Sequence, residues 1–183
     1  METRDDRWIQ TFTGRAFWPL DPDPSKVDIF DIAQSLACNN RFNGHTIVPY
    51  SVAQHSVIVS QICDPADALY GLLHDASEAY IHDIVRPIKL SVQVDGRPYA
   101  EAEDRVMRAI LNHYGLDLPL PESVIHADNV ALVMEKRDLM APCEREWHRY
   151  DITPLAWRVV AVDWKTARSM FMDRFEELTR KAA

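Results

Sequence analysis

The chain has 183 residues, of which 47% are hydrophobic, and 28 Asp and Glu against 20 Lys and Arg give a formal net charge of −8. This length is enough for one domain with a substantial core, and the acidic balance argues against a broad nucleic-acid-binding face. No apolar run approaches the roughly 20 residues of a membrane span, the first ten residues are too polar for a secretory signal, and three scattered cysteines indicate neither disulfides nor a thiolate zinc site, so we expect a cytoplasmic protein that binds no membrane.

The first predicted element is a short β-hairpin, because residues 11–18 alternate around Gly14. Helical periodicity then dominates, with Asp28 as an N-cap, Asp64-Pro65 as a cap followed by a first-turn proline, and Gly115 as a C-terminal cap. The predicted helices cover residues 28–39, 50–63, 64–80, 99–113, 121–140 and 163–181. Residues 82–94 contain Pro87 and mixed polarity, which favours an ordered loop with a short helical piece. The sequence therefore predicts one all-α domain over residues 1–183, with a short N-terminal β-hairpin as an addition.

A candidate metal site begins with the adjacent pair His74 and Asp75. Neighbouring helical residues point about 100° apart, so this pair can converge on a metal only if other segments supply ligands. His55, within an otherwise apolar helix, and Asp128, where an apolar helix face begins, are the candidates. Each alone could be a core histidine or a helix cap. Together, two imidazoles and two carboxylates suit one divalent transition metal per chain (Co, Mn, Zn, Ni or Fe) and leave coordination positions open for water and a phosphoryl oxygen.

These four residues resemble the H…HD…D signature of the HD-domain metal-dependent phosphohydrolases. Residues 74–89, HDASEAYIHDIVRPIK, are similar to the HDASE…D…P-x-K stretch of the bacterial 5′-deoxynucleotidase branch, and residues 51–56, SVAQHS, resemble the segment around its first ligand. Residues 14–22 and 38–45 resemble small bacterial and phage members, including phage dATP triphosphohydrolases. The resemblance covers roughly residues 10–140 and implies an HD-type helical bundle, a catalytic divalent metal, nucleotide substrates and a homo-oligomer.

Glu78 is the candidate catalytic residue, because it lies four residues after His74 and three after Asp75 on a predicted helix. A carboxylate there is placed to deprotonate an attacking water and later to protonate the leaving oxygen. The resemblance implies this role, whereas the alternative is a solvated glutamate at a helix end. The resemblance also implies that Asp83 contacts the sugar or phosphate end of the substrate, and its alternative is a loop cap.

Other candidates are substrate-binding residues. Arg41, Arg86 and Lys89 could balance phosphate charge, although Lys89 could equally brace its loop. Phe42 stands where the resembling branch has tryptophan; like Trp18, it could stack on a base or pack in the core. The remaining candidate, close enough in sequence to approach the site, is His82.

The expected function is hydrolysis of a deoxynucleotide by water that attacks the phosphorus attached to O5′. The leading substrate is dATP or another purine deoxynucleotide, hydrolysed to nucleoside and triphosphate; the alternative is a 5′-deoxynucleotidase that releases phosphate from deoxynucleoside monophosphates. Two alternatives are not enzymes: a nucleotide-sensing HD module without catalytic activity, and a purely structural helical domain. Both explain less well why four ligands and Glu78 occur together. The expected partners are a small-molecule deoxynucleotide and further copies of the chain.

Overall fold

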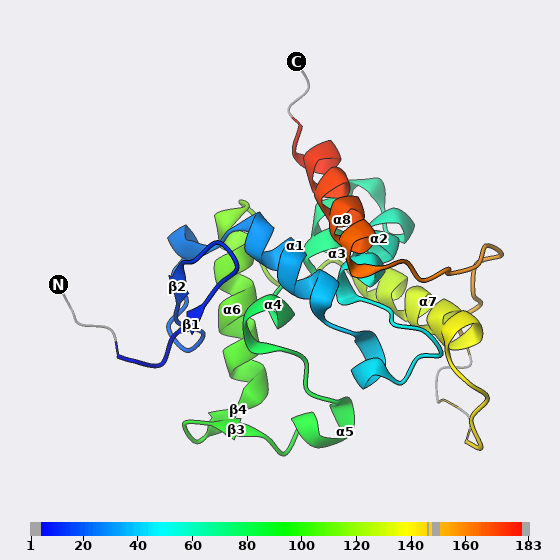
Figure 1. The fold of residues 1–183 in the computed structure, drawn as a ribbon, viewed down its shortest axis with the longest axis horizontal. Helices are drawn as coiled ribbons and strands as arrows, with labels where there is room; N and C mark the ends of the chain where they lie inside the picture. Colours follow the sequence, from blue (N-terminus) through cyan, green and yellow to red (C-terminus); the bar gives the residue numbers. More distant parts are fainter. Residues whose placement is uncertain (1–4, 146, 148–150, 181–183) are drawn as a thin grey trace.

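The computed structural model describes residues 5–145, 147 and 151–180, and most of them are helical (Figure 1). The α-helices are α1 (Ile29–Cys38), α2 (Val52–Ile62), α3 (Ala68–Leu73), α4 (Glu78–Ile81), α5 (Arg86–Lys89), α6 (Tyr99–His113), α7 (Glu122–Leu139) and α8 (Trp164–Thr179). The antiparallel strand pairs are β1 (Ile9–Gln10) with β2 (Ala16–Phe17) and β3 (Gln93–Val94) with β4 (Arg97–Pro98). The all-α class and the N-terminal hairpin are therefore confirmed. Among these helices none is long and apolar enough to cross a membrane.

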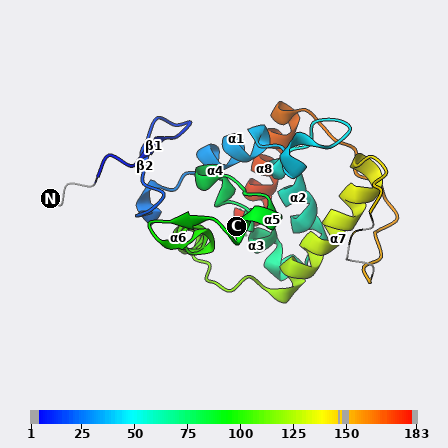
Figure 2. The ribbon, with the colours of Figure 1, turned by 90° about the horizontal axis from the view of Figure 1, so that it is seen from below.

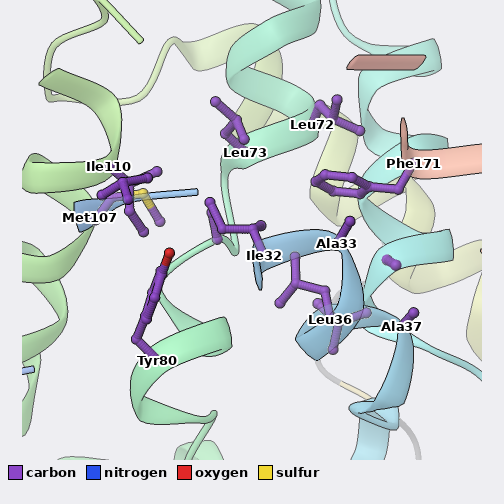
Figure 3. Close-up of a cluster of buried hydrophobic side chains, with 14 of the residues drawn as sticks. Ile32, Ala33, Leu36, Ala37, Leu72, Leu73, Tyr80, Met107, Ile110 and Phe171 are labelled. Carbon is purple, nitrogen blue, oxygen red and sulfur yellow. The ribbon is translucent and has the colours of Figure 1, made fainter. Parts of the chain in front are cut away.

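Helix α2 lies at the centre of the bundle and is buried around nearly its whole circumference. Residues 52–60 are all buried, which is the pattern of a helix enclosed by others. It packs against α1, α3, α7 and α8, and Figure 2 shows it between α1 and α8 on one side and α7 on the other. Side chains from α1, α3, α6 and α8 fill the adjoining core, among them Ile32, Leu36, Leu72, Ile110 and Phe171 (Figure 3).

The predicted helix over residues 64–80 is wrong in one respect, because the structure divides it after Leu73. The carbonyl of Gly71, which a continuous helix would offer to the N–H of Asp75, accepts a hydrogen bond from the His74 ring at 2.9 Å. The next turns use i→i+3 bonds, such as Glu78 N–H to the Asp75 carbonyl at 3.0 Å, before α4 begins. The helix is therefore interrupted at His74 and Asp75, the pair with which the candidate metal site begins.

The loop over residues 82–94 contains the expected short helix, α5, but ends in a hairpin that the sequence analysis did not predict. The turn between β3 and β4 is Asp95-Gly96, with φ of 50° and 75° at the two residues. Positive φ at both central residues is typical of the two-residue hairpin turn that Asp-Gly favours. The expected end of the last helix, Lys181, lies outside the described residues.

Candidate metal centre and adjacent cavity

Four predicted ligands meet where α2, the turn after α3 and α7 come together. His55 Nε2 lies 3.2 Å from His74 Nε2, 3.6 Å from Asp75 Oδ2 and 3.2 Å from Asp128 Oδ1. His74 Nε2 lies 3.2 Å from Asp75 Oδ2 and 4.0 Å from Asp128 Oδ1. With metal–ligand bonds of about 2.1 Å, adjacent donor atoms lie about 3.0–3.4 Å apart, so these spacings are close to one coordination sphere. The buried group of His55, His74 and Asp75 could therefore hold a metal ion.

The hydrogen bonds of the two histidines determine which ring nitrogen faces this centre. His55 Nδ1 lies 2.6 Å from the carboxylate of Glu135, and His74 Nδ1 lies 2.9 Å from the carbonyl of Gly71. Both partners are acceptors, so each Nδ1 carries the proton and donates. Each neutral ring then presents the Nε2 lone pair, and these two lone pairs face each other. A cation between them, whether a proton or a metal ion, removes this repulsion, so the donor set fits a bound metal.

The carboxylates around the centre favour positive charge there. Burial alone would lower the pKa of His74, but the adjacent Asp75 carboxylate outweighs it and raises that pKa to about 9. Burial and Arg41 oppose protonation of His55, yet Glu135 and Asp128 raise its pKa as well. Burial would raise the pKa of Asp75, whereas His74 holds it well below the ordinary range. A metal that enters this centre must therefore displace protons, as expected for imidazole ligands.

Glu78 is held beside the centre by the contacts of α4 with α1. The Asn39 side chain donates to the Glu78 carbonyl at 3.3 Å, and the Ser35 hydroxyl donates to the next carbonyl, of Ala79, at 3.0 Å. Burial raises the pKa of Glu78 to about 9, and the Asp75 and Asp83 carboxylates add to this effect. Glu78 is thus a half-buried carboxyl group that senses the charge of the predicted ligands.

A cavity of about 270 Å³ opens beside Glu78. Its lining includes five of the predicted substrate-binding or catalytic residues besides Glu78, namely Arg41, Phe42, His82, Asp83 and Arg86. The four predicted ligands do not line it, but Arg41 joins the two regions, because its Nη1 lies 3.5 Å from Asp75 Oδ2. Arg41 reaches this position through the antiparallel bridge between Asn40 and Ser51 and a bond from its N–H to the Tyr50 carbonyl.

Two predicted substrate-binding residues are not brought into this cavity. Lys89 forms ion pairs with Glu103 at 2.7 Å and with Asp83 at 3.7 Å, so it braces the loop against α6. Trp18 donates its indole N–H to the Asp5 carbonyl at 2.8 Å and lines a different cavity of about 420 Å³. For Lys89 the bracing alternative describes the observed contacts, and Trp18 lines a cavity that none of the predicted ligands lines.

Three residues at the site were not predicted from the sequence. Glu135 is fully buried on α7 and accepts hydrogen bonds from His55, from the Tyr50 hydroxyl at 2.9 Å and from Arg41 Nε at 3.1 Å. Trp147 packs on Phe42, with ring centroids 5.9 Å apart. A signal existed for Glu135, because it follows Asp128 by seven residues and so lies on the same face of α7. No comparable pattern identifies Tyr50 or Trp147.

Comparisons with known proteins place the chain in a family. No protein-family model matches it. It is 35% identical over 180 residues to the uncharacterized protein YfdR of Escherichia coli K12, an alignment that covers 96% of this chain and 99% of YfdR. It is 34% identical over 155 residues to the uncharacterized protein RCAP_rcc00048 of Rhodobacter capsulatus, covering 78% of each chain. The chain therefore belongs to the family that includes YfdR.

Proposed function

We propose that the protein is a metal-dependent phosphohydrolase of the HD type that acts on deoxynucleotides. The observation that carries the proposal is the convergence of donor atoms from His55, His74, Asp75 and Asp128: the two histidine nitrogens lie 3.2 Å apart, and each carboxylate lies 3.2–4.0 Å from both of them. A mixed set of nitrogen and oxygen donors suits one Mn, Fe, Co, Ni or Zn ion per chain. Because Asp128 is 42% exposed at its side chain, the centre is open to water on that side, as hydrolysis requires.

The bound metal would supply Lewis-acid polarisation of a phosphoryl oxygen and a water of lowered pKa. Glu78 is the proton carrier in this proposal: it takes a proton from the attacking water and passes it to O5′ of the leaving group. Burial, together with the Asp75 and Asp83 carboxylates, raises the pKa of Glu78, while a cation among the ligands acts in the opposite direction. Asp83, which lines the same cavity, is placed to accept hydrogen bonds from the sugar end of the substrate.

The cavity offers the contacts that a nucleotide needs. Arg86 lines it with an exposed side chain, and Arg41 presents the part of its guanidinium that Glu135 and Asp75 leave free. Both can donate to phosphate oxygens. The Phe42 ring, backed by Trp147, provides an aromatic surface for a base. A purine is the expected base and dATP the leading triphosphate; both expectations come from the resemblance to phage enzymes.

The charge of the cavity favours a second candidate, a 5′-deoxynucleotidase acting on monophosphates. Arg41 is paired with Glu135 and Asp75, so among the described residues that line this cavity Arg86 is the cation with no carboxylate partner. A triphosphate carries about two more negative charges than a monophosphate, and each needs a cation or water to replace its hydration. Water attacks the same phosphorus atom in both reactions, so the site chemistry above serves either.

The test is a metal and substrate panel on the full chain. Elemental analysis should find about one transition metal per chain, and phosphate, triphosphate and nucleoside should be quantified with dATP, other deoxynucleoside triphosphates and the monophosphates. Asp75→Ala should lose both metal and activity, because it removes a ligand and a charge. A metal-free protein whose activity ignores chelators would refute the metal mechanism. Tight nucleotide binding without turnover would instead support the nucleotide-sensing reading.

A further inference from the structure

The buried carboxylate of Glu135 has no part in the reaction proposed above, yet both of its oxygens accept hydrogen bonds. One oxygen, Oε1, accepts from His55 Nδ1 at 2.6 Å and from the Tyr50 hydroxyl at 2.9 Å. The other, Oε2, accepts from Arg41 Nε at 3.1 Å. The Arg41 guanidinium forms an ion pair with Glu135, so the structure places this carboxylate as a charged group. Burying a charged carboxylate is costly, so the position of Glu135 against the Nδ1 side of His55 calls for an explanation.

We propose that Glu135 is the positioning residue of the metal centre, setting the orientation and donor strength of His55. By accepting from Nδ1, it fixes the ring so that Nε2 points toward His74 and Asp128. A carboxylate partner also makes an imidazole a stronger ligand than a neutral partner does. His74 has the neutral kind, the carbonyl of Gly71. The two histidines are therefore unequal ligands, with His55 the more electron-rich.

Glu135 also limits how strongly Arg41 pairs with Asp75, one of the predicted metal ligands. Arg41 contacts Glu135 through Nε and Asp75 through Nη1, and the contact with Asp75 is the longer, at 3.5 Å against 3.1 Å. If Glu135 loses its charge, Asp75 becomes the main counter-ion of Arg41 and is less available to a metal. With both imidazoles neutral, the carboxylates of Asp75, Asp128 and Glu135 exceed the charge of Arg41 by two, which a divalent cation balances.

This inference rests on the metal site of the proposed function and is tested by affinity. Metal-free wild-type protein and Glu135→Gln are titrated with Zn²⁺ in competition with a chelator, and we expect binding to Glu135→Gln to be about 10–100-fold weaker. Tyr50→Phe is the matched control, because it removes one hydrogen bond from the same oxygen and keeps the charge. Its affinity should stay within a few-fold of wild type. The melting temperature of each metal-free variant establishes that the comparison is between folded proteins.

The outcomes separate this inference from the proposed function. Wild type that binds no Zn²⁺ overturns the metal site itself. Wild type that binds while Glu135→Gln binds equally well, or a loss in Tyr50→Phe as large as in Glu135→Gln, overturns only the role of the Glu135 charge. If the Glu135→Gln variant does not fold, the wild-type protein alone still allows a test. Imidazole ¹⁵N NMR of the Zn²⁺-loaded wild type should show His55 protonated at Nδ1. The Nδ1 proton should resonate far downfield, as expected for a short charge-assisted hydrogen bond. Protonation at Nε2 would contradict the proposal.

Discussion

Replacement of Gly71 by alanine tests how tightly α3 is held against α2 next to the candidate metal centre. A methyl group at Gly71 would lie 2.8 Å from Cys63 Sγ, 2.9 Å from Ser60 Cα and 3.1 Å from Ser60 N. The sulfur can rotate away, but the Ser60 atoms belong to the α2 backbone. Since unbonded carbon atoms prefer separations of about 3.5–4.0 Å, α3 must move from α2 by about half an ångström or more.

Gly71→Ala has two opposing effects on the free energy of unfolding. In a helix interior, Gly→Ala ordinarily stabilises by about 1 kcal/mol. Overpacking a rigid contact costs about 1–3 kcal/mol, so the net expectation is a loss of up to about 2 kcal/mol in the free energy of unfolding. His74 follows directly on α3 and His55 lies on α2, so the same displacement should widen the 3.2 Å between their Nε2 atoms and weaken metal binding.

Urea denaturation of the metal-free protein and Zn²⁺ titration measure the two consequences of Gly71→Ala separately. The double variant Gly71→Ala, Cys63→Ser is the control, because the shorter serine side chain relieves the contact at position 63 and leaves the backbone contact with Ser60 in place; it should recover little stability. A Gly71→Ala protein that is more stable than wild type, as helix propensity alone predicts, would refute the packing argument. Full recovery in the double variant would show that Cys63 rather than the backbone sets the separation.

Three further predictions test other parts of the proposal and the structure. Glu78→Gln should keep the fold and the metal content but lower kcat by about 10²–10⁴-fold, and near-normal turnover in steady-state assays would exclude Glu78 as the proton carrier. Asp138, whose pKa the hydrogen bonds from Arg137, Val159 N–H and Arg158 lower to about 2, stabilises the fold fully above its unfolded pKa of about 3.9. This contribution is lost as the pH falls through about 2, so the stability advantage of wild type over Asp138→Asn should shrink between pH 4 and 2 in acid titrations followed by circular dichroism. Light scattering should give a particle larger than the 21.0 kDa chain, and a monomer at working concentration would contradict the homo-oligomer.

The helices were predictable because their signals are local. Asp28 does accept from the N–H of Phe30 as the N-cap of α1, and α6 begins and ends at the predicted residues, Tyr99 and His113. The break after Leu73 was not predictable, because it depends on a hydrogen bond from a side chain that faces another helix. The second hairpin had a local signal, Asp95-Gly96, that the mixed polarity of its surroundings obscured.

That His55, His74 and Asp75 lie together could be predicted from the sequence, because residue type limits metal chemistry. Their supporting residues could not, since a glutamate on a helix is most often solvated, and only packing shows that Glu135 is buried. The contacts of Lys89 and Trp18 are likewise tertiary: each side chain is committed to a partner that no spacing in the sequence identifies.

Backbone strain gives an independent reason to regard the cavity as functional. Among the described residues, the non-glycine positions with positive φ are Phe42, Asn43, His82 and Asp95, and the first three line this one cavity. Such conformations cost about 1–3 kcal/mol each and persist where surrounding contacts hold them. The Tyr99 hydroxyl provides one such contact, at 2.7 Å from the His82 carbonyl. Asp95 belongs to its hairpin turn, whereas the other three place their strain at the cavity that Arg41 and Glu78 also line. Selection for stability alone does not explain why strained backbone and ionisable side chains occur together at this cavity.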